Sequence, residues 1–254
     1  MGRIVQRVLI VIGLGLLLAA CHQNGTVFAV DTTDDTVDAN PGDGICADAN
    51  GDCSLRAAVM EANALPGVEE IRLVEGETYL LDHWFLDVDD DEGEIGDLDI
   101  TAGVVLTGKG TVERTSASPA FDVHTDELVE FAGLRFVGNG IRAQPESRVL
   151  IDRVDAFAIR NGRWLEIDDA WVSVTRTTIV DWDGFDALAI DFDGGTLFVD
   201  ALTTSLEGPI TSLGFPGIAL RVGDGNATVG SSTLVGGRLI NDAGGGTLTV
   251  RNSI

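Results

Sequence analysis

From residue 68 onward, the chain repeats one short pattern of apolar and polar positions. Two apolar residues flank a residue of any kind, and runs rich in Gly, Asp and Asn separate the copies. Copies occupy residues 129–131, 149–151, 172–174, 197–199, 227–229 and 248–250. Their first positions lie 20, 23, 25, 30 and 21 residues apart. Alternation with a period of two predicts strands, and a repeat of this length predicts coils that stack into a solenoid.

The self-similar repeats favour a parallel β-helix over a β-sandwich. Both folds contain short alternating strands, but the chain lacks the two-residue spacing that is typical of hairpins. Two earlier segments, 70–81 and 96–110, fit further coils. We therefore predict an all-β solenoid over residues 68–254. Because the sequence stops inside a strand repeat, we expect this domain to be truncated at its C-terminus.

A short amphipathic helix precedes the repeats. Ser54 is a good N-cap residue, and Pro66 and Gly67 end the helical pattern. One apolar stripe follows helical spacing and contains Leu55, Ala58, Val59 and Ala62. A stacked-strand column exposes unpaired backbone groups on its terminal coil. We therefore predict that residues 29–67 form an N-terminal cap, with the stripe lying on the open end of the first coil.

Residues 1–20 predict a signal peptide. Arg3 and Arg7 flank the start of an apolar run from Val8 to Leu18, which is short for a membrane span of about 20 residues. The small residues before Cys21 resemble a bacterial lipobox, in which the cysteine is acylated and becomes the mature N-terminus. We expect residues 21–28 to be a tether between this lipid and the folded domain. An ordinary signal peptide with an incidental cysteine is the alternative.

The chain is strongly acidic, with a formal net charge of −25. Removal of the signal peptide leaves 16 − 2 = 14 basic and 41 acidic residues, so the mature net charge is 14 − 41 = −27. We expect no binding to nucleic acid, because such binding depends on Lys and Arg neutralising phosphates. We expect the protein to contact the membrane only through its lipid. A surface of this charge suits divalent cations or basic partners.

Two cysteines remain for the folded domain, Cys46 and Cys53. We predict a disulfide between them, because exported proteins fold in oxidising compartments. Reduced thiols and thiols bound to a metal are the alternatives. No histidine lies near this pair in the sequence, which argues against a zinc site there.

Several motifs resemble those of one family. Residues 53–58 read CSLRAA, residues 61–63 read EAN, residues 96–100 read GDLDI and residues 30–35 read VDTTDD. Together they resemble the CSLREA-motif exported proteins of bacteria and archaea. The resemblance implies a right-handed, pectin-lyase-like parallel β-helix placed at the cell surface or outer membrane, and it implies no settled activity. Ala57 departs from the family, which has a Glu that closes a capping box.

Two acidic loops are candidates for calcium. Asp87, Asp89 and Asp91 belong to an acidic run that extends to Asp99. Alternating aspartates supply several of the six to eight oxygen ligands that calcium takes. The EF-hand pattern is not met, and a solvated acidic loop is the alternative. The shorter loop at residues 48–52 has the same ambiguity, and we expect its glycine to serve a turn.

A second acidic cluster is the candidate for catalysis. Asp181 and Asp183 lead this cluster, which also includes Asp186, Asp191 and Asp193 with Trp182 and Phe192 between them. Carboxylate pairs and an aromatic sugar platform are typical of β-helix enzymes that cleave polysaccharides. The chain lacks the other motifs of such enzymes. The alternative to a catalytic site is that these acids simply occupy coil turns and the outer face of the solenoid.

We therefore expect a lipid-anchored envelope protein, at the outer membrane or cell surface, that binds a glycan or a surface protein without catalysis. A polysaccharide lyase or glycoside hydrolase is the first alternative, and a purely structural envelope component is the second.

Overall fold

The computed structural model describes residues 25–81, 94–114, 116, 118–157, 163–180, 188–205, 218–235, 238–241 and 245–254. Several predicted sites lie outside these ranges. They are the signal peptide and Cys21, the calcium candidates Asp87, Asp89 and Asp91, and the catalytic candidates Asp181 and Asp183.

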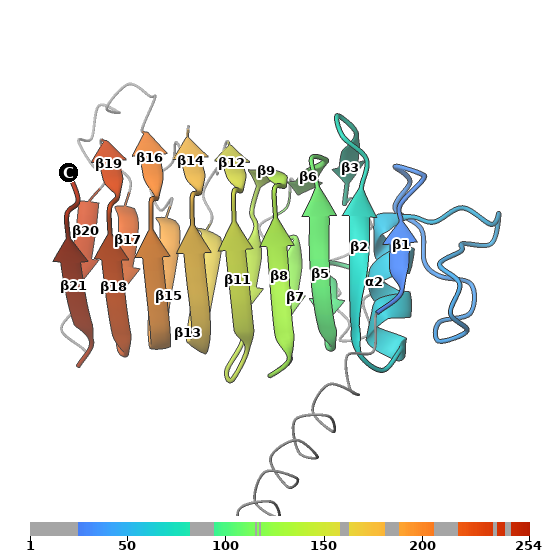
Figure 1. The fold of residues 1–254 in the computed structure, drawn as a ribbon, viewed down its shortest axis with the longest axis horizontal. Helices are drawn as coiled ribbons and strands as arrows, with labels where there is room; N and C mark the ends of the chain where they lie inside the picture. The colour runs from blue at the N-terminus through green and yellow to red at the C-terminus, as the bar shows by residue number, and fades with distance from the viewer. Residues whose placement is uncertain are drawn as a thin grey trace, which may run out of the picture.

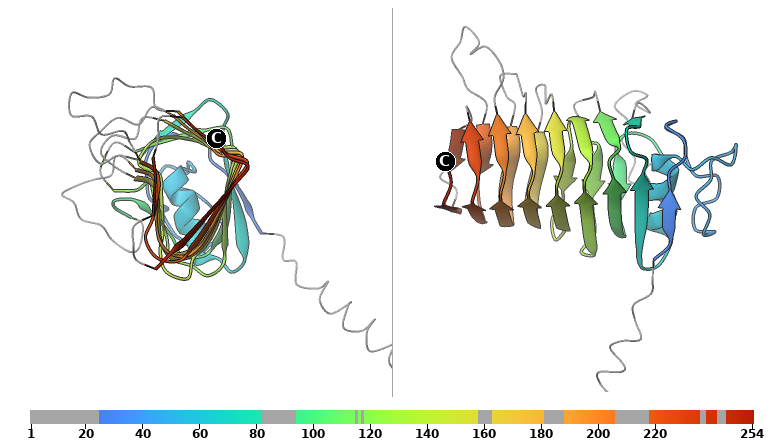
Figure 2. Two further views of the ribbon diagram at one scale, coloured as in Figure 1. Left: turned by 90° about the vertical axis from the view of Figure 1, so that its left-hand side faces the viewer. Right: turned by 45° about the horizontal axis from the view of Figure 1, so that its top comes forward.

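The chain winds into a parallel β-helix, which confirms the predicted all-β fold (Figure 1). Each coil passes through three columns of strands in the same order, and neighbouring strands of a column pair in parallel. Seen along its axis, the coils superpose on one another (Figure 2). We call the columns first, second and third in the order in which a coil visits them.

The first column contains β4 (Leu98–Ile100), β7 (Phe121–Val123), β10 (Ile141–Ala143), β17 (Ile218–Val222) and β20 (Arg238–Asn241). The second column contains β1 (Val27–Ala29), β2 (Val68–Leu73), β5 (Gly103–Gly108), β8 (Leu128–Ala132), β11 (Arg148–Asp152), β18 (Asn226–Gly230) and β21 (Thr247–Arg251). Two long strands run through both columns, β13 (Arg163–Thr175) and β15 (Leu188–Asp200). The third column contains β3 (Thr78–Leu80), β6 (Thr111–Arg114), β9 (Arg135–Gly138), β12 (Asp155–Phe157), β14 (Thr178–Val180), β16 (Thr203–Ser205) and β19 (Thr233–Val235).

The repeated apolar pattern forms the interior of the second column. Its first positions pair in register along the solenoid, in the order Val129, Val149, Val172, Leu197, Ala227 and Leu248. The second apolar positions pair likewise, and those from Phe131 to Val229 are buried. Because successive residues of a strand face opposite sides, the pattern puts one apolar row inside and a polar row outside.

Buried aromatic side chains pack against one another in the interior of the solenoid. Phe121, Phe131 and Phe136 come from the three columns of one coil, and their ring centroids lie 5.1–6.3 Å apart. Trp164, from a later coil, packs edge-on against Phe136. All four side chains are buried, so this coil joins its columns through direct ring contacts.

The predicted helix is present as α2 (Leu55–Ala64), with the Ser54 side chain accepting a hydrogen bond from the Ala57 amide. The predicted apolar stripe is buried in the core cluster, and α2 contacts β2, β4 and β5 at the end of the solenoid (Figures 1 and 2). The helix is also buried on its other sides, from Leu55 to Ala62. Within the described ranges, no helix has the length and apolar character needed to cross a membrane.

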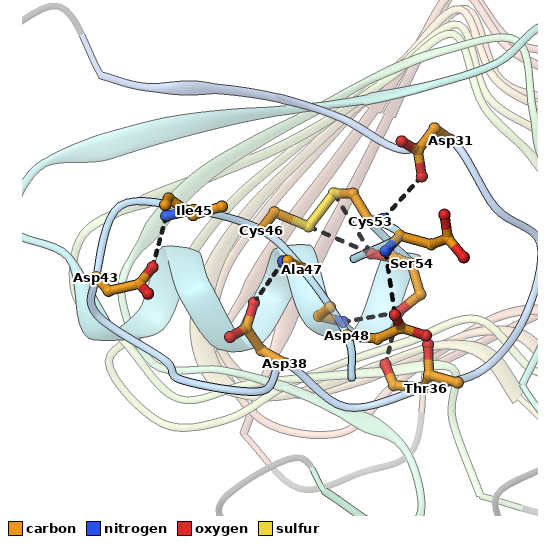
Figure 3. Close-up of a disulfide and its surroundings, with 12 residues drawn as sticks. Asp31, Thr36, Asp38, Asp43, Ile45, Cys46, Ala47, Asp48, Cys53 and Ser54 are labelled. Carbon is orange, nitrogen blue, oxygen red and sulfur yellow. Dashed lines mark hydrogen bonds between the residues drawn. A yellow bond between two sulfur atoms is a disulfide. The ribbon is translucent and has the colours of Figure 1, made fainter. Parts of the chain in front are cut away.

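The loop before α2 forms part of the cap (Figure 3). Cys46 and Cys53 form the predicted disulfide, with their Cα atoms 5.1 Å apart. The carboxylate of Asp38 accepts a hydrogen bond from the Ala47 amide, and that of Asp31 accepts one from the Cys53 amide. The disulfide and these hydrogen bonds hold the loop against the start of α2.

A buried arginine joins the cap to the first coils. Arg56 is 0% exposed, and its guanidinium forms two hydrogen bonds with the Asp35 carboxylate, at 2.7 and 3.1 Å. It also donates to the carbonyl oxygens of Gly96 and Asp97, just before β4. Asn63 adds a second link, because its side chain donates to the Asp99 carbonyl and accepts from the Thr101 amide. The cap is therefore fixed to the coil by polar contacts as well as by apolar burial.

Replacing Arg56 with Ala removes one partner of an ion pair whose side chains are at most 4% exposed. We expect Arg56→Ala to lower the free energy of unfolding by about 3–5 kcal/mol, as measured by urea denaturation. Arg72→Ala is the matched control, because the Arg72–Glu70 pair is exposed, and it should cost less than about 1 kcal/mol. Equal losses in the two variants would contradict this role of Arg56.

Candidate functional site

The outward side of the first column carries a regular row of charged residues. One charged side chain occupies the same register position on each of six successive strands: Asp99, Asp122, Arg142, Glu166, Asp191 and Arg221. We call this row the charged ladder. Stacked strands lie about 4.8 Å apart, so neighbouring members of the ladder are within reach of one another.

Arginines hold the carboxylates of the ladder in place. Arg142 lies between Asp122 and Glu166, at 3.3 Å from each. Asp191 is buried, and its two oxygens pair with Arg163 and Arg221, each at 2.6 Å. These arginines are 33–42% exposed. The face therefore presents guanidinium groups to solvent, and buried carboxylates orient them.

The charge of Arg142 is fixed by its neighbours. Burial on its own lowers the pKa of Arg142, but the charges of Asp122 and Glu166 and their hydrogen bonds outweigh this effect and raise the pKa. Arg142 therefore carries a positive charge at neutral pH.

The N-terminal end of the ladder has a different composition. Asp99 and Asp122 are directly opposite each other on β4 and β7, and His124 follows two residues after Asp122 on the same side. The His124 Nε2 atom lies 3.6 Å from Asp99 Oδ1 and 3.4 Å from Asp122 Oδ1. Asp122 uses its other oxygen to accept hydrogen bonds from Arg142 and Gln144. In the described part of the chain, these are the residues placed to hold a metal ion.

The structure describes three members of the predicted catalytic cluster: Asp191, Phe192 and Asp193. Asp191 and Asp193 lie on the outer side of β15, which agrees with the alternative that these acids occupy the outer face. Phe192 does not belong to a sugar platform, because it is 0% exposed and lies in the core. The alternation of a strand places Phe192 inward when its two neighbours face outward.

The loop at residues 48–52 is a turn, as predicted for its glycine. The Asp48 carboxylate accepts hydrogen bonds from the amides of Asn50 and Asp52, and Gly51 has a φ of +93°. Backbone hydrogen bonds from Asp52 and Asn50 lower the pKa of Asp48. The Asp48 carboxylate thus accepts hydrogen bonds from its own loop (Figure 3 shows its position).

Sequence reasoning missed His124, Arg142, Glu166 and Arg221 as a set. A signal for them exists, because each ladder residue from Asp122 onward precedes the first apolar position of its repeat by six or seven residues: 129 − 122 = 7, 149 − 142 = 7, 172 − 166 = 6, 197 − 191 = 6 and 227 − 221 = 6. Aligning the repeats on their apolar positions would have brought the ladder residues from Asp122 to Arg221 to within one position of one another. His124 has a different offset and would not have been found in this way.

Comparison with known proteins adds no relative. No protein-family model, no curated protein and no solved structure matches the chain.

Replacing Arg142 leaves two carboxylates of the ladder without a shared counter-charge. We expect Arg142→Ala to lower the free energy of unfolding by about 1.5–3 kcal/mol, because hydrogen bonds to charged groups contribute about that much. Urea denaturation would measure it. Lys109→Ala is the control, since Lys109 forms an exposed pair with Glu75 and should cost at most about 0.5 kcal/mol. An Arg142 variant as stable as the control would show that the ladder is not a coupled network.

Proposed function

We propose that the protein is a lipid-anchored β-helix of the bacterial cell envelope that binds a glycan, without catalysis, on the outward side of its first column. The charged ladder is the observation that supports this proposal. A rigid row of donors and acceptors at the strand spacing suits a repeating polymer, and solenoids use extended faces for binding.

The chemistry of the ladder favours a glycan over a protein as the ligand. Protein interfaces centre on a fully buried apolar or aromatic patch. From β4 to β17, the ladder position of the first column holds a charged group instead, for example Arg142 or Glu166, and Gln144 follows β10. Such groups both donate to and accept from sugar hydroxyls, and arginine also binds carboxylates through two parallel hydrogen bonds.

The same contacts favour binding over catalysis. Proton transfer needs a carboxyl group that is available to the substrate. The carboxylate of Asp191 is buried beneath two arginines, and that of Glu166 pairs with Arg142 and Arg163. These acids position arginines, which is a binding role.

We also propose that the lipid is attached at Cys21, that the protein is displayed at the outer membrane or cell surface, and that the chain belongs to the CSLREA-motif proteins. The buried contacts of Arg56 and Asn63 support the last point, because they connect the segments on which the resemblance rests.

Glycan binding can be measured on arrays with the full chain in detergent. We expect Arg163→Ala to weaken binding about tenfold, because it removes an exposed donor and costs about 1.4 kcal/mol of binding free energy. Arg148→Ala is the control on the second column, where Arg148 is also exposed, and it should leave binding unchanged.

A reducing-sugar assay separates binding from catalysis. We expect no release of reducing ends from any polysaccharide that the protein binds. Turnover that disappears in Asp181→Ala or Asp183→Ala would contradict the proposal and favour a glycan-cleaving enzyme. Binding to a protein ligand, with none to glycans, would contradict it in favour of a protein receptor.

Lipid attachment has its own measurement. We expect mass spectrometry of the membrane-extracted protein to find acyl mass on the peptide that begins at residue 21, and Cys21→Ser to lose it. The substitution removes the thiol that carries the acyl chain and should leave the folded domain unaltered. An identical mass in the two proteins, apart from the substitution itself, would remove the anchor from the account.

A further inference from the structure

We propose that Asp99, Asp122 and His124 form a binding site for a divalent transition-metal ion of the zinc class. The site lies at the N-terminal end of the charged ladder. The proposal goes beyond glycan binding and does not rest on it, because it depends only on the arrangement of these three side chains.

The first argument is geometric. Zinc binds nitrogen and oxygen ligands at about 2.0–2.2 Å, so two tetrahedral ligands lie about 3.3–3.6 Å from each other. The His124 Nε2 atom lies 3.4 Å from Asp122 Oδ1 and 3.6 Å from Asp99 Oδ1. The three ligand atoms all lie within 4.8 Å of one another. The two distances from His124 match the edges of a tetrahedral coordination shell, and the bound of 4.8 Å keeps the third atom within reach of the same ion.

The second argument excludes a simple histidine–carboxylate pair as the reason for the arrangement. A charge-assisted N–H···O hydrogen bond is about 2.7–2.9 Å long, and one Nε2 atom donates one proton. Here a single Nε2 atom lies between two carboxylate oxygens, and both distances exceed 3.3 Å. The imidazole is therefore placed less well for a hydrogen bond than for sharing a cation with both carboxylates.

The third argument concerns a buried oxygen atom. Asp122 is 4% exposed, and its Oδ1 atom has no hydrogen-bond partner. Its Oδ2 atom, in contrast, accepts from Arg142 and Gln144, which fix the orientation of the carboxylate. A buried carboxylate oxygen without a partner is costly, and it points toward the other two ligand atoms. A bound cation would satisfy this oxygen.

The strand register explains why the residues meet and why a cation is favoured. Asp99 and Asp122 are directly opposite on adjacent strands, and like charges in such positions repel each other. A divalent ion between them turns this repulsion into attraction. His124 is 38% exposed, so one side of the site is open to solvent and leaves a coordination position accessible.

The donor set indicates which ion binds. Imidazole nitrogen suits zinc and similar transition metals, and carboxylate oxygens also bind them. Calcium takes six to eight oxygen ligands, whereas this cluster offers two carboxylates and a nitrogen. The site shares Asp99 with the acidic run that begins at Asp87, but its other two ligands, Asp122 and His124, lie outside that run.

Isothermal titration of the full chain in detergent with zinc chloride, after removal of metals with a chelator, tests the proposal. We expect saturable binding of one zinc ion per chain. His124→Ala and Asp122→Asn should each weaken binding by at least about tenfold, because even second-shell changes commonly cost that much. The double variant His22→Ala/His83→Ala replaces the other two histidines of the chain and should bind zinc as the unaltered protein does.

Spectroscopy distinguishes loss of the metal site from misfolding of the variant. Cobalt titrated in place of zinc should give visible absorption bands from a coordinated metal, and these bands should vanish in His124→Ala. Because His124 is partly exposed, this variant should keep the circular dichroism spectrum of the folded chain. Absence of saturable zinc binding, or zinc binding and cobalt bands that persist unchanged in His124→Ala, would overturn the proposal.

Discussion

One buried guanidinium group, that of Arg56, joins the cap to the solenoid. It connects three segments that are distant in sequence: the loop that carries Asp35, the helix α2 and the backbone at Gly96 and Asp97. Removing a charge from water costs several kcal/mol, so a buried arginine is tolerated only where acceptors surround it. The carbonyl oxygens of Gly96 and Asp97 are available as acceptors, because the chain enters β4 beside the N-terminal turn of α2. The cap and the first coil are consequently one structural unit, on which the later coils stack.

The charged ladder follows from the same regularity that builds the core. Residues alternate between the interior and the surface of a strand, and parallel pairing keeps equivalent residues of successive coils in line. The row of Phe121, Ile141 and Leu165 is therefore buried, and the adjacent row of Asp122, Arg142 and Glu166 faces outward. An arginine follows each of two pairs of neighbouring acids along the outer row, since Arg142 follows Asp99 and Asp122 and Arg221 follows Glu166 and Asp191. These opposite charges on adjacent strands stabilise the stacking. At its N-terminal end two acids are neighbours, and the adjacent histidine makes that end suited to a cation.

The sequence was sufficient for features that depend on local pattern, and insufficient for those that depend on register. The apolar repeats, the helix and the Cys46–Cys53 disulfide were predicted, because alternation, helical spacing and short separation express them directly. The burial of Arg56 was missed, since its acceptors come from residues about 20 and 40 positions away. The pairing of Asp122 with Arg142 was missed for a related reason, because insertions of varying length between strands obscure which residues align. Phe192 was assigned to the surface because acids flank it, although the period of two places it inside.

Hydrogen exchange measured by mass spectrometry tests the central claim most directly, by comparing the unaltered protein with Asp35→Asn. In a solenoid each coil is stabilised by its neighbours, so loosening the cap should open the nearest coil first. The account predicts that peptides covering β2 and β4 lose protection, whereas peptides covering β11 and β18 keep it. Unchanged protection in β2 and β4, or an equal loss along the whole solenoid, would contradict the claim that the Arg56 contacts seal the first coil.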